Sequence, residues 1–281
     1  MTIDLHTHSA VSDGTDSPEE LVRAAARAGL SVVALTDHDT GDGLAAASRT
    51  AEAVGIGLLP GVEVSTRFQG HSVHLLGYGV DFTEPRLAAE LERIRSGRND
   101  RLSPVLAKLA QLGVPVTEAQ VRAQVGASPS VGRPHIADAL VAAGHVADRR
   151  EAFDRFLHDG GPAHVPRYAV DLPTGIALVR GAGGVSVLAH PWGRHTRTVL
   201  DPDTVTRLVA EQGLDGLEVD HQDHDAEARA SLRALADRLG VLATGSSDYH
   251  GTGKVDHDLG CNTTTAEVHA EIVRRIAARR R

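Results

Sequence analysis

Short apolar runs alternate with helical segments through most of this 281-residue chain, and that alternation restricts the folds it can adopt. Residues 32–35 and 185–189 are apolar runs of the kind found in parallel strands that are buried on both faces. Between such runs lie segments with helix punctuation, for example one that opens at Ser17-Pro18 and closes at Gly29. About seven strand–helix units can be counted, which favours a (β/α) barrel over an open doubly wound sheet.

The alternation is interrupted once. From about residue 85 the apolar residues recur with helical spacing and no strand pattern, until the glycine pair Gly160-Gly161. Because consecutive helices here break an otherwise alternating order, we predict a small helical insertion domain over residues 91–165. The barrel is then built from two parts, residues 1–90 and 166–281, and we expect the insertion to cap its site.

Polar residues of two kinds, imidazoles and carboxylates, follow the predicted strands. In a barrel the carboxyl ends of the strands form the catalytic face, so side chains placed there converge. Six imidazoles and three carboxylates with no thiolate suit Zn²⁺, Mn²⁺ or Fe²⁺, without choosing among them. The predicted metal ligands are His6, His8, Asp13, His38, Glu63, His74, His190, Asp248 and His250.

Five motifs in order resemble the polymerase and histidinol phosphatase (PHP) family: DLHTHS with Asp13, TDHD, Glu63 with HLLGY, LAHP, and SDYHG. The resemblance covers both parts of the chain outside the insertion. It implies a distorted (β/α)7 barrel and two or three divalent metal ions. By the family pattern, one ion is held by His6, His8, Glu63 and Asp248, a second by Glu63, His74 and His190, and a third by Asp13, His38 and His250.

Such a centre favours phosphate chemistry. Three divalent ions carry six positive charges against three from the carboxylates, so the site stays cationic and attracts a phosphate. A metal-bridging hydroxide is available as a nucleophile near neutral pH, which predicts hydrolysis of a phosphate monoester.

Substrate choice is expected to come from outside the ligand set. Residues 130–135, SVGRPH, resemble the nucleotide phosphatases and related exonucleases of the family, and Arg133 and His135 could present a guanidinium and an imidazole to an anion. The alternative for Arg133 is an ion pair with an acidic residue of the barrel. Arg194 is a further candidate for phosphate binding, and His135 is a candidate general acid for the leaving group.

Four more polar residues lie near these motifs. Asp37 and Asp39 flank His38, and we expect them to orient imidazoles by accepting hydrogen bonds. For Lys254 and His224, in loops at the same face, a solvated position is expected.

The resulting functional hypothesis is a metal-dependent phosphoesterase that removes the 3′-phosphate of a nucleoside 3′,5′-bisphosphate. The alternatives are a 5′–3′ exonuclease on short RNA, a histidinol phosphatase, and a non-catalytic metal-binding module. The long helical insertion resembles the nucleotide subgroup better than the histidinol phosphatases, and the complete ligand set argues against a module without activity.

Composition limits the partners. The net charge of −8 argues against wrapping of duplex DNA, although a locally basic pocket remains compatible with it. A single cysteine, the absence of a signal-peptide pattern and the absence of a long apolar stretch predict a cytoplasmic protein without membrane contact. A small phosphorylated substrate or short RNA is the expected partner, and no oligomeric state follows from the sequence.

Overall fold

The computed structural model describes residues 1–193 and 196–280 and shows a mixed α/β barrel. Seven strands follow one another around a nearly closed sheet in the order β1-β2-β3-β4-β6-β7-β8, and β5 adds to the edge of β3. The predicted fold class, a distorted (β/α)7 barrel, is confirmed. The strands are β1 Ile3–Asp4, β2 Val32–Leu35, β3 Gly57–Phe68, β4 His71–Tyr78, β5 Val170–Asp171, β6 Val185–Ala189, β7 Gly216–Asp220 and β8 Leu242–Gly245.

One strand runs against the others, and this is where the barrel is distorted. β4 is antiparallel to both β3 and β6, whereas β1-β2-β3 and β6-β7-β8 are parallel. The cause is the connection between β3 and β4, a two-residue turn at Gln69-Gly70 with φ of 47° and 86°, which leaves no room for a crossover helix. Residues 57–68 form one long strand, β3.

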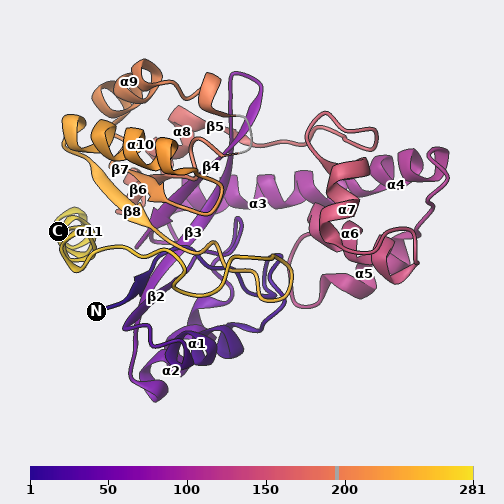
Figure 1. The fold of residues 1–281 in the computed structure, drawn as a ribbon, viewed down its shortest axis with the longest axis horizontal. Coiled ribbons are helices and arrows are strands. Elements are labelled where there is room, and N and C mark those ends of the chain that lie inside the picture. Colours follow the sequence, from indigo (N-terminus) through magenta and orange to yellow (C-terminus); the bar gives the residue numbers. More distant parts are fainter. Residues whose placement is uncertain (194–195, 281) are drawn as a thin grey trace.

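Helices surround the sheet, with α1 and α2 against the first strands and α8 to α10 on the opposite side (Figure 1). α1 begins with a capping box, in which the Ser17 side chain accepts from the Glu20 amide and Glu20 accepts from the Ser17 amide. The helices of the barrel are α1 Pro18–Arg27, α2 Leu44–Val54, α8 Leu172–Gly181, α9 Pro202–Gln212, α10 Ala226–Leu239 and α11 Ala266–Arg279, with a short 3₁₀ turn at Thr196–Thr198.

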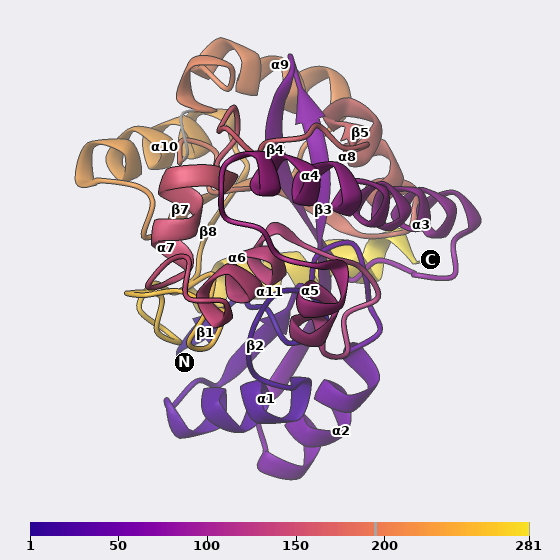
Figure 2. The same ribbon diagram turned by 90° about the vertical axis from the view of Figure 1, so that its right-hand side faces the viewer.

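Consecutive helices fill the region between β4 and β5. They are α3 Pro85–Asp100, α4 Leu102–Gln111, α5 Glu118–Val125, α6 Arg133–Ala142 and α7 Arg149–Ala152, continued by a π-helical turn at Phe153–Leu157. α4 to α7 stand beside the barrel at the far end of α3, and Figure 2 looks from their side toward the strands.

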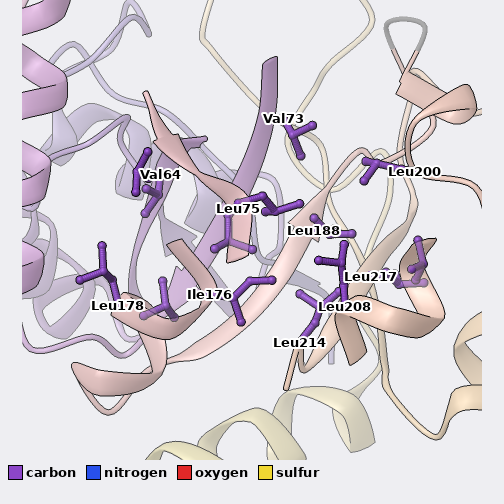
Figure 3. Close-up of a cluster of buried hydrophobic side chains, with 14 of the residues drawn as sticks. Val64, Val73, Leu75, Ile176, Leu178, Leu188, Leu200, Leu208, Leu214 and Leu217 are labelled. Carbon is purple, nitrogen blue, oxygen red and sulfur yellow. The ribbon is translucent and has the colours of Figure 1, made fainter. Parts of the chain in front are cut away.

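Buried apolar side chains form separate clusters. The largest lies between β3, β4, β6 and β7 and the helices α8 to α10, where Leu75, Leu188 and Ile176 pack together (Figure 3). α3 joins it through Leu87, Leu91 and Ile94. A second cluster is made only of residues between 102 and 165, so the helices after α3 have a core of their own. Among the described residues, no helix combines the length and apolar character that a membrane crossing needs.

Candidate metal centre and substrate cavity

All nine predicted metal ligands lie together at one end of the barrel. His6 and His8 follow β1, Asp13 lies in the next turn, His38 follows β2 and His190 follows β6. Asp248 and His250 follow β8. The prediction that every ligand stands at the carboxyl end of a strand is wrong for Glu63 and His74, which lie inside β3 and β4. The antiparallel β3–β4 hairpin brings the two residues to the same place from opposite directions.

Glu63 is at the middle of the group, because its two carboxylate oxygens face different histidines. Oε2 lies 3.0 Å from Nε2 of His8, 3.2 Å from Nε2 of His6 and 3.2 Å from Nδ1 of His38. Oε1 lies 2.8 Å from Nδ1 of His74 and 3.3 Å from Nε2 of His190. Burial opposes ionisation of this carboxyl, but the neighbouring imidazoles, His38 foremost, hold the pKa of Glu63 well below its usual value.

The other two carboxylates extend the group on either side. Asp13 has Oδ1 3.3 Å from Nε2 of His250 and Oδ2 3.7 Å from Nε2 of His38. Asp248 has Oδ1 3.5 Å from Nε2 of both His6 and His8. Among the described residues, donor atoms within metal-chelating distance of one another form four sets: His8, Asp13, His38 and His250; His6, His8 and Asp248; His38, Glu63 and His74; and His221, Asp248 and His257. The first three consist of predicted ligands alone, whereas the fourth contains only Asp248 of them.

Some of the donor atoms have no suitable hydrogen-bond partner within the group, which is the arrangement expected of metal ligands. Nδ1 of His38 and Nδ1 of His74 are buried and make no hydrogen bond, although each lies close to an oxygen of Glu63. Nε2 of His6 and Nε2 of His8 are only 3.0 Å apart, so two ring nitrogens point at the same spot. Buried ring nitrogens that lack a hydrogen bond, and ring nitrogens that point at each other beside carboxylate oxygens, are an arrangement that a bound divalent ion satisfies.

Two residues that were not predicted from the sequence, Glu218 and His221, contact members of this group and support them. Glu218, fully buried in β7, has Oε1 3.1 Å from Nδ1 of His6, and its Oε2 accepts a hydrogen bond from the His190 amide at 2.7 Å. His190 has a positive φ of 31°, so this bond helps to hold an unfavourable backbone conformation. His221 lies with Nε2 3.3 Å from Oδ2 of Asp248. Two features of the sequence could have identified these residues. Glu218 is a carboxylate inside an apolar strand, and His221 directly follows that strand.

Asp37 and Asp39 do not orient imidazoles, so that prediction is wrong. Asp37 accepts hydrogen bonds from the amide and hydroxyl of Ser9 and from the hydroxyl of Ser12. Asp39 accepts from the amide and hydroxyl of Ser65 and from the guanidinium of Arg98. Both carboxylates bond to hydroxyl, amide or guanidinium groups instead of imidazoles, and these bonds stabilise the loops that carry them.

The expected solvated positions of Lys254 and His224 are also wrong. His224 is buried, with Nδ1 2.9 Å from the Val219 carbonyl oxygen and Nε2 facing the Trp192 amide. Lys254 forms an ion pair with Asp248. Arg194, a predicted phosphate ligand, lies outside the described residues.

An open cavity of about 1310 Å³ joins the ligand group to the helical insertion. Seven of the nine predicted ligands line it, and only the fully buried His6 and His8 do not. Outside the ligand group the wall of the cavity is rich in arginine, formed by Arg67, Arg98, Arg101, Arg133, Arg149, Arg150 and Arg167.

The two predicted cap residues are placed differently. Arg133 lines the cavity and contacts Asp159 at 2.6 Å and the Leu157 carbonyl oxygen at 2.9 Å, so its acidic partner belongs to the insertion rather than to the barrel. His135 is buried beneath the wall and does not line the cavity. Its Nδ1 accepts a hydrogen bond from the Gly132 amide at 3.0 Å, and burial lowers its pKa. A role for His135 as general acid stays a prediction.

Comparisons with known proteins agree with this geometry. A PHP domain model matches residues 4–111. A 3′,5′-nucleoside bisphosphate phosphatase from Chromobacterium violaceum is 37% identical, over 97% of this chain and 98% of its own length. A 5′-3′ exoribonuclease from Haemophilus influenzae is 36% identical, over 88% of this chain and 89% of its own.

The chain belongs to the PHP family. A metal-dependent phosphoesterase structure from Bifidobacterium adolescentis matches it with a TM-score of 0.92 at 37% identity, covering 97% of this chain and 96% of that one. The predicted resemblance is confirmed, and this PHP protein is a hydrolase that acts on phosphoric ester bonds.

Proposed function

We propose that this PHP protein removes the 3′-phosphate from a nucleoside 3′,5′-bisphosphate. The observation that carries the proposal is a single cavity with a metal-binding group on one wall and several guanidinium groups on the other. A nucleotide with two phosphates has an anion for each wall. The C. violaceum relative is a 3′,5′-nucleoside bisphosphate phosphatase and matches nearly the whole chain, which supports the same assignment.

The nine predicted ligands would hold two or three divalent ions, of Mn²⁺, Zn²⁺ or Fe²⁺. Bound ions of this kind supply a nucleophile near neutral pH and offset the charge that develops on a phosphoryl group. Glu63, Asp13 and Asp248 keep their carboxylates ionised for this task, because the surrounding imidazoles and Lys254 hold their pKa values low against the effect of burial. Glu218 and His221 hold the ligands in place, and Arg133 can reach the substrate from the insertion.

A 5′–3′ exoribonuclease acting on short RNA is the second candidate. The cavity is larger than most small-molecule sites, which span roughly 300–1,000 Å³, so it has room for more than one nucleotide. The H. influenzae relative is a 5′-3′ exoribonuclease of similar length.

The test is a substrate panel on protein reconstituted separately with Mn²⁺, Zn²⁺ and Fe²⁺. We expect phosphate release from adenosine 3′,5′-bisphosphate, and little from histidinol phosphate. The products of an end-labelled short RNA separate the two nucleotide candidates, since an exonuclease shortens the RNA stepwise. Bound metal with no hydrolysis of any phosphoester would favour the non-catalytic module instead.

The variant His8→Ala tests the metal-binding role proposed for the ligand group. His8 contributes to two of the donor sets, so its loss should lower kcat/KM by at least roughly 100-fold and reduce the metal content. His71→Ala is the control, because His71 is an exposed histidine on the same hairpin that takes no part in the group. Equal activity of the two variants would contradict the assignment of His8.

A further inference from the structure

Three arginines that line the cavity, Arg98, Arg101 and Arg167, lie close enough for their charges to act on one another, and they are named here the arginine cluster. Arg98 lies near the end of α3, Arg101 lies between α3 and α4, and Arg167 lies on the segment that leads back to the barrel. All three line the cavity. The cluster therefore stands at the junction of the barrel and the helices that follow α3.

Two members of the cluster are fixed in place by the barrel. Arg98 donates from Nε and Nη2 to Oδ2 of Asp39 at 3.0 and 2.8 Å, and from Nη2 to Oγ of Ser65 at 2.8 Å. Arg167 donates from Nη2 to the same Ser65 oxygen at 2.9 Å. Bonds of this kind orient a guanidinium before any ligand arrives, which lowers the entropy lost on binding.

Arg101 has no such partner. It is only 6% exposed, and within residues 1–193 and 196–280 its guanidinium makes no hydrogen bond or ion pair. Burial, reinforced by the charges of Arg167, Arg133 and Arg98, holds the pKa of Arg101 well below its usual value. A buried and unpaired cation is costly, so a site that keeps one is suited to an anion that enters from the cavity.

The net charge of the side chains around the arginine cluster indicates what charge the bound anion should carry. The strongest charges acting on Arg101 and Arg167 come from the arginine cluster, Arg133, Asp39 and Asp159. Four guanidinium groups face two carboxylates there, which leaves an excess of two positive charges. A phosphate monoester carries about −1.5 to −2 at pH 7 and offers three acceptor oxygens, which matches this excess.

The cluster also adjoins the metal-binding group. Asp39, which holds Arg98, directly follows His38, and Ser65 is paired with His74 across the hairpin. The arginine cluster and the metal-binding group therefore line one cavity and are connected through neighbouring residues of the barrel.

We propose that the arginine cluster is a second phosphate subsite, which binds the 5′-phosphate of a nucleotide while its 3′-phosphorus lies at the metal-binding group. This inference rests on the proposed function. Both a nucleoside 3′,5′-bisphosphate and a 5′-phosphorylated RNA present a terminal phosphate to the cluster, so the subsite serves either substrate.

The kinetic test compares substrates that differ only in the 5′-phosphate. Adenosine 3′,5′-bisphosphate is compared with adenosine 3′-monophosphate, and a 5′-phosphorylated RNA trimer with its 5′-hydroxyl form. For the wild-type protein we expect kcat/KM to be at least roughly tenfold higher with the 5′-phosphate in at least one pair. The pair that responds identifies the source of the phosphate.

Arg101→Met should reduce that preference at least roughly tenfold, and Arg101→Lys should restore part of it. Arg122→Met is the control, because Arg122 is exposed on α5 and pairs only with Glu118 in its own helix. Binding of adenosine 5′-monophosphate to chelator-treated protein, measured by calorimetry, gives a readout that needs no turnover. Its affinity should fall at least roughly tenfold in Arg101→Met and stay unchanged in Arg122→Met.

The outcomes separate this inference from the proposed function. A wild-type protein that hydrolyses both members of each pair equally well overturns the subsite and leaves the phosphatase intact. Unchanged affinity of Arg101→Met for adenosine 5′-monophosphate does the same, and a thermal melt verifies that the variant is folded. Hydrolysis of none of the four substrates, with 5′-monophosphate still bound through Arg101, overturns the proposed function alone.

Discussion

At the scale of single residues, the site depends on side chains that hold other side chains. Glu218 contacts His6 through one oxygen and the backbone of His190 through the other, so one carboxylate sets the position of two predicted ligands. The hydroxyl of Ser246 also donates to it. A histidine ligand whose second ring nitrogen is held by a carboxylate has a fixed tautomer and a fixed ring orientation.

Glu218→Gln should therefore weaken metal binding about 10- to 100-fold and lower kcat/KM by a similar factor. The reason is that a neutral amide is a poorer acceptor for His6 than a carboxylate. Metal affinity is measured by titration of chelator-treated protein and compared with the exposed control Glu211→Gln. Wild-type affinity in Glu218→Gln would show that this contact does not position His6.

At the scale of elements, the β3–β4 hairpin does more than any helix to build the site. Glu63 and Ser65 are two residues apart in β3 and share one face of the strand, and His74 of β4 is paired with Ser65. The hairpin thus presents a predicted metal ligand from each strand and the hydroxyl that holds Arg98 and Arg167. It is the element that connects the two walls of the cavity.

The last helix, α11, is fastened to the sheet by Asp215. This carboxylate precedes β7, accepts a hydrogen bond from the Ser186 amide of β6 at 3.0 Å, and contacts Arg279 at 2.7 Å and Arg275 at 3.3 Å on α11. Burial opposes its ionisation, but these partners outweigh that effect and lower the pKa of Asp215. The contacts tie the C-terminal helix to two strands of the barrel.

Asp215→Asn should lower the free energy of unfolding by about 1–3 kcal/mol at pH 7. A carboxyl whose folded pKa is depressed contributes stability above its unfolded pKa and loses it as pH falls through the folded pKa. The difference between wild type and variant should therefore shrink below about pH 4. Urea denaturation at a series of pH values measures it, and a difference that does not vary with pH would contradict the ionic origin.

At the scale of the whole molecule, the cavity exists because two separate cores meet. The barrel supplies the predicted ligands, and the helices after α3, with a hydrophobic cluster of their own, supply most of the opposite wall. Arg149 spans the two, pairing with Asp138 of α6 and donating to the Asp13 carbonyl oxygen. The exact limits proposed for the insertion, residues 91–165, and the cytoplasmic location stay predictions.

Removal of metal should destabilise the whole protein. Ligands that bind only the folded state add stability, about 2.7 kcal/mol when the free ion is at 100 times its Kd. For a chain of this length a loss of that size lowers Tm by roughly 5–10 °C. Calorimetry with and without chelator tests this, with readdition of Mn²⁺ or Zn²⁺ to reverse the shift. A Tm that does not respond to chelator would mean that the group holds no ion under those conditions.

The sequence by itself determined the alternating α/β architecture, the helices between β4 and β5, and the identity of nine polar residues that converge. It could do so because apolar runs, caps and the residues that follow them are local signals, read along the chain. The resemblance to the PHP family added how those residues divide among metal ions, which stays a prediction.

Only the tertiary structure decided what those residues touch. The hydrogen bonds of Asp37 and Asp39 to serines, the support from Glu218 and His221, and the unpaired Arg101 all depend on contacts between distant parts of the chain. Glu218, for example, lies 212 positions from the His6 ring that it holds. Local patterns specify which strands and helices form. The packing of the whole barrel determines which buried charged groups have a hydrogen-bond or ion-pair partner and which have none.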